Sequence, residues 1–247
     1  MSAMNTIKAI AKRELFAYFD SPVAYVFLVI FLLLAGVFTF TFGGFFGRGE
    51  ASLASFFGWL PWLFLFLVPA VGMRMWAEER RSGTIELLLT LPIAPWEAIV
   101  GKFLASWIFL AIAMALTFPI WITVNLLGVP DNGIIFAGYV GSMLLAGSYL
   151  AIASMTSAMT RNQVVSFIVA VVLCLALILV GFVPITDLLA RYASPENVER
   201  VASFGVLTHF DGFQKGILDS RNVLFFLSIM IFALFVTAVL VRNRRKN

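Results

Sequence analysis

Charge is scarce in this chain of 247 residues. Asp, Glu, Lys and Arg together make up 12% of it, whereas soluble domains carry roughly 25%. Hydrophobic residues account for 62%, and the mean hydropathy is +1.00. This composition excludes an ordinary water-soluble domain and predicts that lipid is the solvent for most of the chain.

Cysteine and histidine occur once each. Cys174 lies in an apolar run and has no second thiol in the chain, which excludes an internal disulfide and a cysteine-based metal site. His209 stands two residues before Asp211, but no GxSxG elbow or HExxH helix accompanies it. We interpret His209 as a structural residue and expect that the chain is not an enzyme.

A nucleotide-binding loop is also missing. No GxxxxGK[ST] stretch occurs, so this polypeptide cannot hold nucleotide phosphates in that way, and any ATP that drives it must be hydrolysed on another chain. The net charge of +4 is not arranged as a basic stripe with interleaved aromatic residues. We therefore expect no bound cofactor, no metal and no nucleic-acid partner.

Long apolar runs dominate what is present. Six of them are bounded by charge or by Gly and Pro, at residues 23–42, 56–76, 99–127, 134–159, 164–185 and 223–241. Each is long enough to cross about 30 Å of hydrocarbon as a helix. The alternating pattern of barrel strands is absent. The sequence predicts an all-α integral membrane protein with six transmembrane helices, kinked at Pro69 and Pro119.

The basic residues predict the orientation. If the N-terminus is cytoplasmic and the spans alternate, 12 of the 17 Lys and Arg residues fall on the inside, and the opposite orientation would invert this bias. Both termini are then cytoplasmic. The inside residues are Lys8, Lys12, Arg13, Arg74, Arg80, Arg81, Lys102, Arg161, Arg242, Arg244, Arg245 and Lys246.

Two segments have distinctive patterns besides hydropathy. Residues 4–19 gather apolar side chains toward one side, with Glu14 interrupting the stripe, and predict an amphipathic helix along the inner leaflet, although a plain cytoplasmic tail is the alternative. The fourth span is rich in small residues with small-xxx-small spacing, including Ala137 and Gly141. That helix should lie centrally in the bundle or at a dimer seam.

The membrane interior offers no obvious coupling chemistry. The later spans carry no charged residue at depth, and Arg161 falls in the short turn between spans four and five. Proton-coupled carriers need ionisable residues inside the membrane, so transport powered by this chain alone is disfavoured. A self-contained carrier and a membrane scaffold remain the alternatives to an ATP-driven transporter.

The connection after span two is the most informative segment. It reads EERRSGTIELLLTLP at residues 78–92, in which Thr84 can cap a short helix over 85–91 that begins with Glu86 in its first turn. That helix is too apolar for a free loop. It is suited to a groove on a partner protein, and a helix resting in lipid headgroups is the alternative.

These residues resemble the corresponding connection of ABC-2 type permeases, and are most similar to the gliding-motility-associated and nitrous-oxide-reductase-maturation membrane subunits. A second stretch, HFDGFQKGILDSR at residues 209–221, is similar to the segment before the final helix in the same group. The resemblance covers essentially the whole chain in length, span count and loop placement.

The resemblance implies a single ABC-2 type transmembrane domain over 1–247. It has an interfacial helix at 1–20, a cytoplasmic coupling region at 77–98 and short external re-entrant helices at 186–221. It also implies a half-transporter in a bacterial inner membrane, which pairs with a copy of itself or a related permease and with two ATPase subunits that bind ATP and Mg. The residues placed at the ATPase contact are Glu78, Glu79, Arg80, Gly83, Thr84, Glu86 and Leu88.

On this interpretation the function is export through a dimeric pathway, driven by separate ATPase subunits. A periplasmic auxiliary protein is a further partner that the resemblance suggests. The chain has no large periplasmic domain between its first two spans, which excludes a macrolide-exporter type of mechanism and leaves the substrate open.

Overall fold

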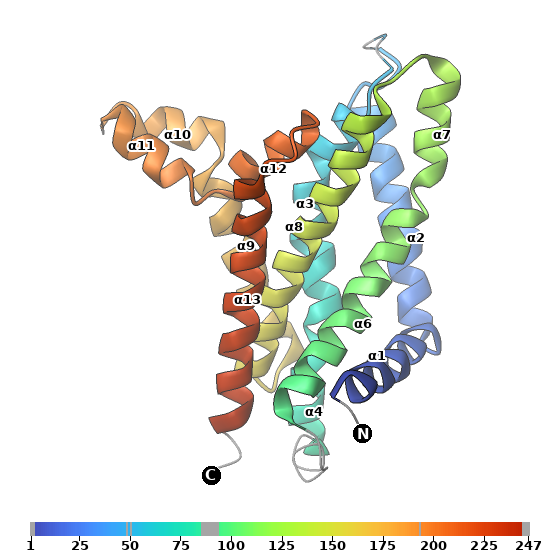
Figure 1. Ribbon diagram of the computed structural model, residues 1–247, viewed down its shortest axis with the longest axis vertical. Coiled ribbons are helices and arrows are strands. Elements are labelled where there is room, and N and C mark those ends of the chain that lie inside the picture. Colours follow the sequence, from blue (N-terminus) through green and yellow to red (C-terminus); the bar gives the residue numbers. More distant parts are fainter. Residues whose placement is uncertain (1–2, 48, 50, 85–93, 193, 244–247) are drawn as a thin grey trace.

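The computed structural model describes residues 3–47, 49, 51–84, 94–192 and 194–243. Six helical segments are long and apolar enough to cross a membrane, which confirms the prediction of an all-α membrane protein (Figure 1). They are α2 Pro22–Val37 with the π-helix η1 Phe38–Phe42, α3 Ala54–Gly72 with α4 Arg74–Ser82, α6 Pro95–Ala115 with α7 Phe118–Leu127, α8 Asn132–Met159, α9 Gln163–Val180, and α13 Ser220–Asn243.

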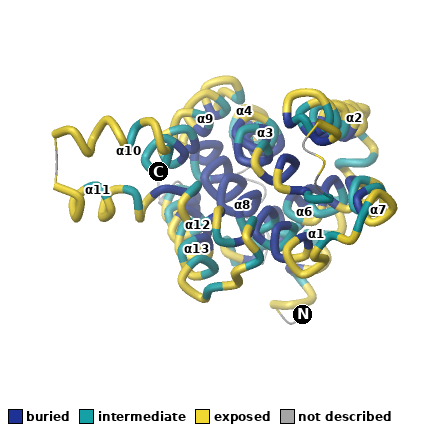
Figure 2. Tube along the Cα trace, turned by 90° about the horizontal axis from the view of Figure 1, so that it is seen from above, coloured by how far each residue is buried: buried dark blue, intermediate teal, exposed yellow. Residues whose placement is uncertain are grey.

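The helix α8 forms the centre of the bundle. It contacts α3, α4, α6, α9, α12 and α13, and Figure 2 shows its buried trace surrounded by the other helices. Its small residues allow these approaches, because an added Cβ at Gly138 would lie 2.5 Å from the Phe57 ring and one at Gly141 would lie 2.5 Å from Phe213. The central position predicted for the fourth span is confirmed.

Pro119 and Pro69 lie close to the points where the third and second spans each divide into two helices. The third span breaks into α6 and α7 just before Pro119, and the Thr117 hydroxyl donates to the Met114 carbonyl in the break. The predicted kink is therefore a complete interruption. Pro69 lies in the last turn of α3, where its carbonyl accepts the N–H of Met73, the residue that joins α3 to α4.

The helix α1 Ala3–Phe19 crosses the end of the bundle at which α4 and the end of α13 also lie (Figure 1). It packs on α6, where Gly101 permits a close approach to Ile10. Farther along, the Tyr18 ring stacks on Phe109 at 5.1 Å and its hydroxyl bonds the Ser106 hydroxyl at 2.8 Å. This packing rules out the plain tail.

Three short helices, α10 Val183–Leu189, α11 Pro195–Ala202 and α12 Val206–Gln214, lie between α9 and α13. The fifth span was predicted to run to residue 185, but α9 ends at Val180 because the chain turns where Gly181 packs against the backbone of Gly205. Figures 1 and 2 show α10 and α11 projecting from the bundle with exposed surfaces, whereas α12 packs on α8.

His209 belongs to this packed part of the short helices. Its ring stacks on Phe225 at 3.9 Å, and its two nitrogens bond the Asn222 side chain and the Ser203 carbonyl at 2.9 and 2.8 Å. The ring ties α12 to α13, in agreement with a structural role.

The tightest helix contact generates a stability prediction. A Cβ added at Gly72 would lie 2.4 Å from the Ala153 Cβ, whereas Gly58 in the same helix has nothing within 4 Å. Gly72→Ala should lower the free energy of unfolding by about 1–3 kcal/mol through overpacking. Gly58→Ala should be neutral or stabilising by up to about 1 kcal/mol. Thermal unfolding of both variants in the same detergent tests this, and equal melting temperatures would contradict it.

Candidate functional site

The helix α4 carries the described part of the predicted coupling region. It buries Met75, Trp76 and Ala77 near its beginning, and charged residues follow them from Glu78 to Arg81. It ends at Gly83, whose φ of 74° is the left-handed conformation that commonly ends helices. Arg80 and Arg81 lie in its last turn, where cations interact favourably with the helix dipole.

Two serines of α8 hold the beginning of α4. The Ser157 hydroxyl accepts the N–H groups of Trp76 and Ala77 at 3.0 Å each and donates to the Met73 carbonyl at 2.8 Å. The first N–H groups of a helix have no partner within it, and Met73 supplies no side-chain cap. Ser157 therefore caps α4 from a neighbouring helix. The fully buried Trp76 indole adds a bond from Nε1 to the Ser154 hydroxyl at 3.0 Å.

The charged residues farther along α4 reach the turn between α8 and α9. The Arg80 guanidinium donates to the carbonyl of Ala158, near the end of α8. The Gln163 amide, in the first turn of α9, donates to the Glu78 carboxylate. The end of α4 is thus linked to both helices that this turn connects.

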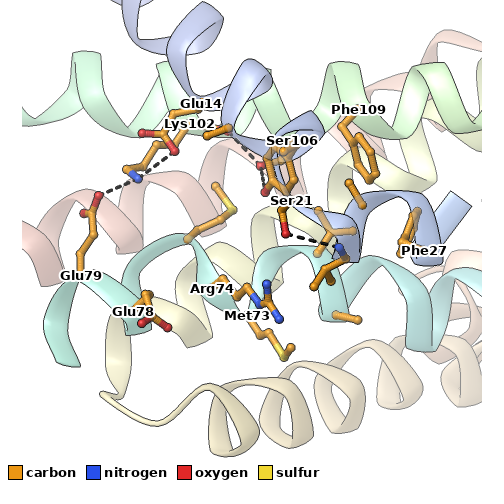
Figure 3. A pocket seen from close by; sticks show the side chains of 17 residues that line it. Glu14, Ser21, Phe27, Met73, Arg74, Glu78, Glu79, Lys102, Ser106 and Phe109 are labelled. Carbon is orange, nitrogen blue, oxygen red and sulfur yellow. Dashed lines mark hydrogen bonds and ion pairs between the residues drawn. The ribbon is translucent and has the colours of Figure 1, made fainter. Parts of the chain in front are cut away.

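Glu79 connects α4 to α6 and α1 through a buried lysine (Figure 3). The Lys102 ammonium lies 2.7 Å from Glu79 Oε1 and 3.3 Å from Glu14 Oε2, and its side chain is only 7% exposed. It also lies over the Trp76 ring, 5.6 Å from the centroid. We call Glu14, Lys102 and Glu79 the ionic triad.

The environment of the triad changes the acidity of α1 side chains. Burial acts to raise the pKa of Glu14, but the charges of Lys102 and Arg13 outweigh it and hold that pKa below its ordinary value. Burial raises the pKa of Tyr18 to about 12, although its bond to Ser106 opposes the rise. Glu14 is therefore ionised and Tyr18 neutral near pH 7.

The predicted contact residues are only partly brought together. Glu78, Glu79 and Arg80 point to three different neighbouring elements. Thr84 lies beyond the turn at Gly83, and its hydroxyl bonds that of Ser82 at 2.9 Å. Glu86 and Leu88 lie outside the described residues, as does the predicted helix over 85–91.

Sequence reasoning missed the ionic triad. Lys102 was counted only as an orientation signal, and Glu14 only as an interruption of an apolar stripe. The available signal was that Glu14 shares a helical face with Ile7, Ile10 and Tyr18, which are buried or partly buried. A carboxylate on a packed face requires a cationic partner.

A cavity of about 390 Å³ lies beside the triad, between α1, the beginning of α2, the α3–α4 junction and α6. Figure 3 shows the side chains around it, with charged groups from α4 and α6 on one side and the aromatic ring of Phe109 on another.

Six spans, of which the small-residue helix α8 is the central one, and a charged helix that continues span two agree with one family. A model described as ABC-2 family transporter protein matches residues 8–245. The chain belongs to the ABC-2 transporter family. Among curated proteins, none matches the chain.

Membership makes this ABC-2 protein a membrane permease subunit of an ABC transporter. The match includes α1 from Lys8 onward and all six spans. The ionic triad, the serine caps on α4 and the cavity therefore all lie inside the permease domain.

The buried lysine of the permease should be important for its stability. Lys102→Met removes the partner of two largely buried carboxylates and should lower the free energy of unfolding by about 2–4 kcal/mol. Lys215→Met is the matched control, since Lys215 pairs with Asp211 at an exposed site, where a pair contributes less than about 1 kcal/mol. Thermal unfolding in detergent tests this prediction, and equal melting temperatures of the two variants would contradict it.

The triad also predicts a pH dependence. Because the folded-state pKa of Glu14 is lowered, its stabilisation is complete above the ordinary value of 4.5 and is lost as pH falls through the folded-state value. The stability difference between the wild type and Glu14→Gln should be constant between about pH 6 and 8 and should shrink below pH 4.5. Denaturant unfolding across this range tests it, and a difference that grows in acid would contradict it.

Proposed function

We propose that this chain is the permease half of an exporter whose motion is driven by separate ATPase subunits docked on the 77–98 region. The observation that carries the proposal is the set of contacts made by α4. Within the described residues it is bonded to α8 through Trp76, to the start of α9 through Glu78, and to α6 and α1 through Glu79. Displacement of α4 therefore acts on four other helices.

The physical route from docking to transport is a rigid-body transition. Packed helices have few discrete arrangements, so closing of an ATPase pair can shift them as units. In this proposal the partner contacts Gly83, Thr84, Glu86 and Leu88, together with the outer charges of α4. The segment 85–91 is the expected docking helix, because its apolar sequence is suited to a protein groove.

The complete transporter contains two permease chains, either identical or related, and two ATPase subunits that bind ATP and Mg. Its pathway runs along spans one, two and five of the two permeases. The protein lies in a bacterial inner membrane with both termini and α4 in the cytoplasm, as the basic residues predict. The 186–221 region then faces the periplasm, where an auxiliary protein can bind. We also propose that the protein is related to the gliding-motility-associated and nitrous-oxide-reductase-maturation membrane subunits.

Co-purification with the candidate ATPase tests the docking site. Wild-type protein solubilised in mild detergent should co-purify with the ATPase. Glu86→Arg reverses a charge in the expected contact and Leu88→Asp replaces an apolar side chain with a charged one, so both variants should lose the ATPase. Glu196→Arg, on exposed α11 at the other end of the molecule, is the matched control and should retain it.

All variants must first be shown to insert in the membrane at the wild-type level. Failure of the wild type to bind an ATPase, or full retention by both Glu86→Arg and Leu88→Asp, would show that the coupling assignment is wrong.

A further inference from the structure

The cavity beside the ionic triad has two chemically different sides. Its charged side includes all three members of the triad together with Arg74 and Glu78. Its apolar side is formed by residues from three spans: Val23, Ala24 and Phe27 of α2, Ala70 and Val71 of α3, and Phe109 of α6. A ligand that fills it must itself be amphiphilic.

The cavity lies beside the beginning of the first apolar span. Its charged side is level with the amphipathic helix α1 and with Ser21, directly before the apolar span Pro22–Phe42. Its apolar side extends into that span as far as Phe27, whose ring packs 5.3 Å from that of Phe109. This order, polar outside and apolar within, is that of a lipid headgroup and its acyl chain.

One cation on the charged side has no hydrogen-bond or ion-pair partner among the described residues. Lys102 is paired twice. Arg74 is exposed and has no hydrogen bond or ion pair with any residue that the structure describes. Glu78 is one helical turn away and could have paired with it, but its carboxylate takes the Gln163 amide instead. Within the described part of the chain, the Arg74 guanidinium is therefore an unpaired group in the lining of the cavity.

The charges also indicate which headgroup fits. A guanidinium matches the geometry of phosphate oxygens. Three carboxylates and two cations line the cavity, an excess of one negative charge, so a headgroup with net negative charge would increase the imbalance. A zwitterionic headgroup does not, and its amine can lie at Glu78 while its phosphate lies at Arg74, one turn of about 5.4 Å away along the helix.

We propose that this cavity is a binding site for a membrane glycerophospholipid with an amine headgroup, such as phosphatidylethanolamine. Arg74 binds the phosphate, Glu78 binds the ammonium, and an acyl chain lies against Phe27 and Ala70. The site is intrinsic to the permease chain and does not depend on ATPase docking.

Native mass spectrometry of the delipidated permease tests the site. The wild type should bind added phosphatidylethanolamine more tightly than phosphatidylglycerol. Arg74→Ala should weaken binding of both lipids about tenfold, the effect of one charged hydrogen-bonding group. Glu78→Gln should remove the preference for phosphatidylethanolamine and leave phosphatidylglycerol binding intact or improved.

The matched controls are Arg81→Ala, which removes an exposed cation from α4 outside the cavity, and Glu196→Gln on α11. Both should bind lipid as the wild type does. Arg74→Ala should have the same melting temperature as the wild type, because Arg74 has no partner among the described residues. Reduced lipid binding by this variant then cannot be attributed to unfolding.

Three results would overturn the proposal. The first is equal lipid binding by Arg74→Ala and Arg81→Ala. The second is a wild type that binds phosphatidylglycerol as well as phosphatidylethanolamine. The third is displacement of the lipid by inorganic phosphate at equal concentration, which would mean that the site recognises a free anion and gains nothing from the acyl chain.

Discussion

Burial of the Lys102 ammonium is the constraint on which this end of the permease depends. A charge removed from water must be paired and hydrogen-bonded, and Lys102 meets that requirement with one carboxylate from α1 and one from α4. Together with the contacts of Ile10 and Tyr18 on α6, the pairing holds α1 and α4 against α6. The cavity is lined by these three helices together with α2 and α3, and it includes all three members of the triad.

The spans could be predicted from the sequence because hydropathy is a local property of each segment. Crowded small residues in 134–159 likewise predicted the centre of the bundle, since only glycine admits the rings of Phe57 and Phe213 so closely. The ends of the helices were harder to predict from the sequence. The end of α9 at Val180 depends on the contact between Gly181 and Gly205, and residue 185 is as apolar as the span before it.

The ionic triad could not be predicted from the sequence, because Glu14 lies 65 residues before Glu79 and 88 before Lys102 and no motif joins them. Each charge has a local explanation when taken alone: Glu14 as an exception in an amphipathic helix, Glu79 as part of a charged stop and Lys102 as an orientation signal. Only the packing of α1 on α6 brings the three together. The contact residues Glu86 and Leu88 stay predictions, since they lie outside the described residues.

The two serines of α8 and the ionic triad hold different parts of α4. Ser154 and Ser157 attach its beginning to the central helix α8, which has the largest buried share of the six spans. The triad attaches its middle to α6 and to α1 at the edge of the bundle. A force applied beyond Gly83 thus acts on a helix fixed at one end to the core and along its length to the periphery, so it would rotate the outer helices about α8. That motion would change the shape of the cavity between α1, α2 and α4, because its lining residues come from both sides of this pivot.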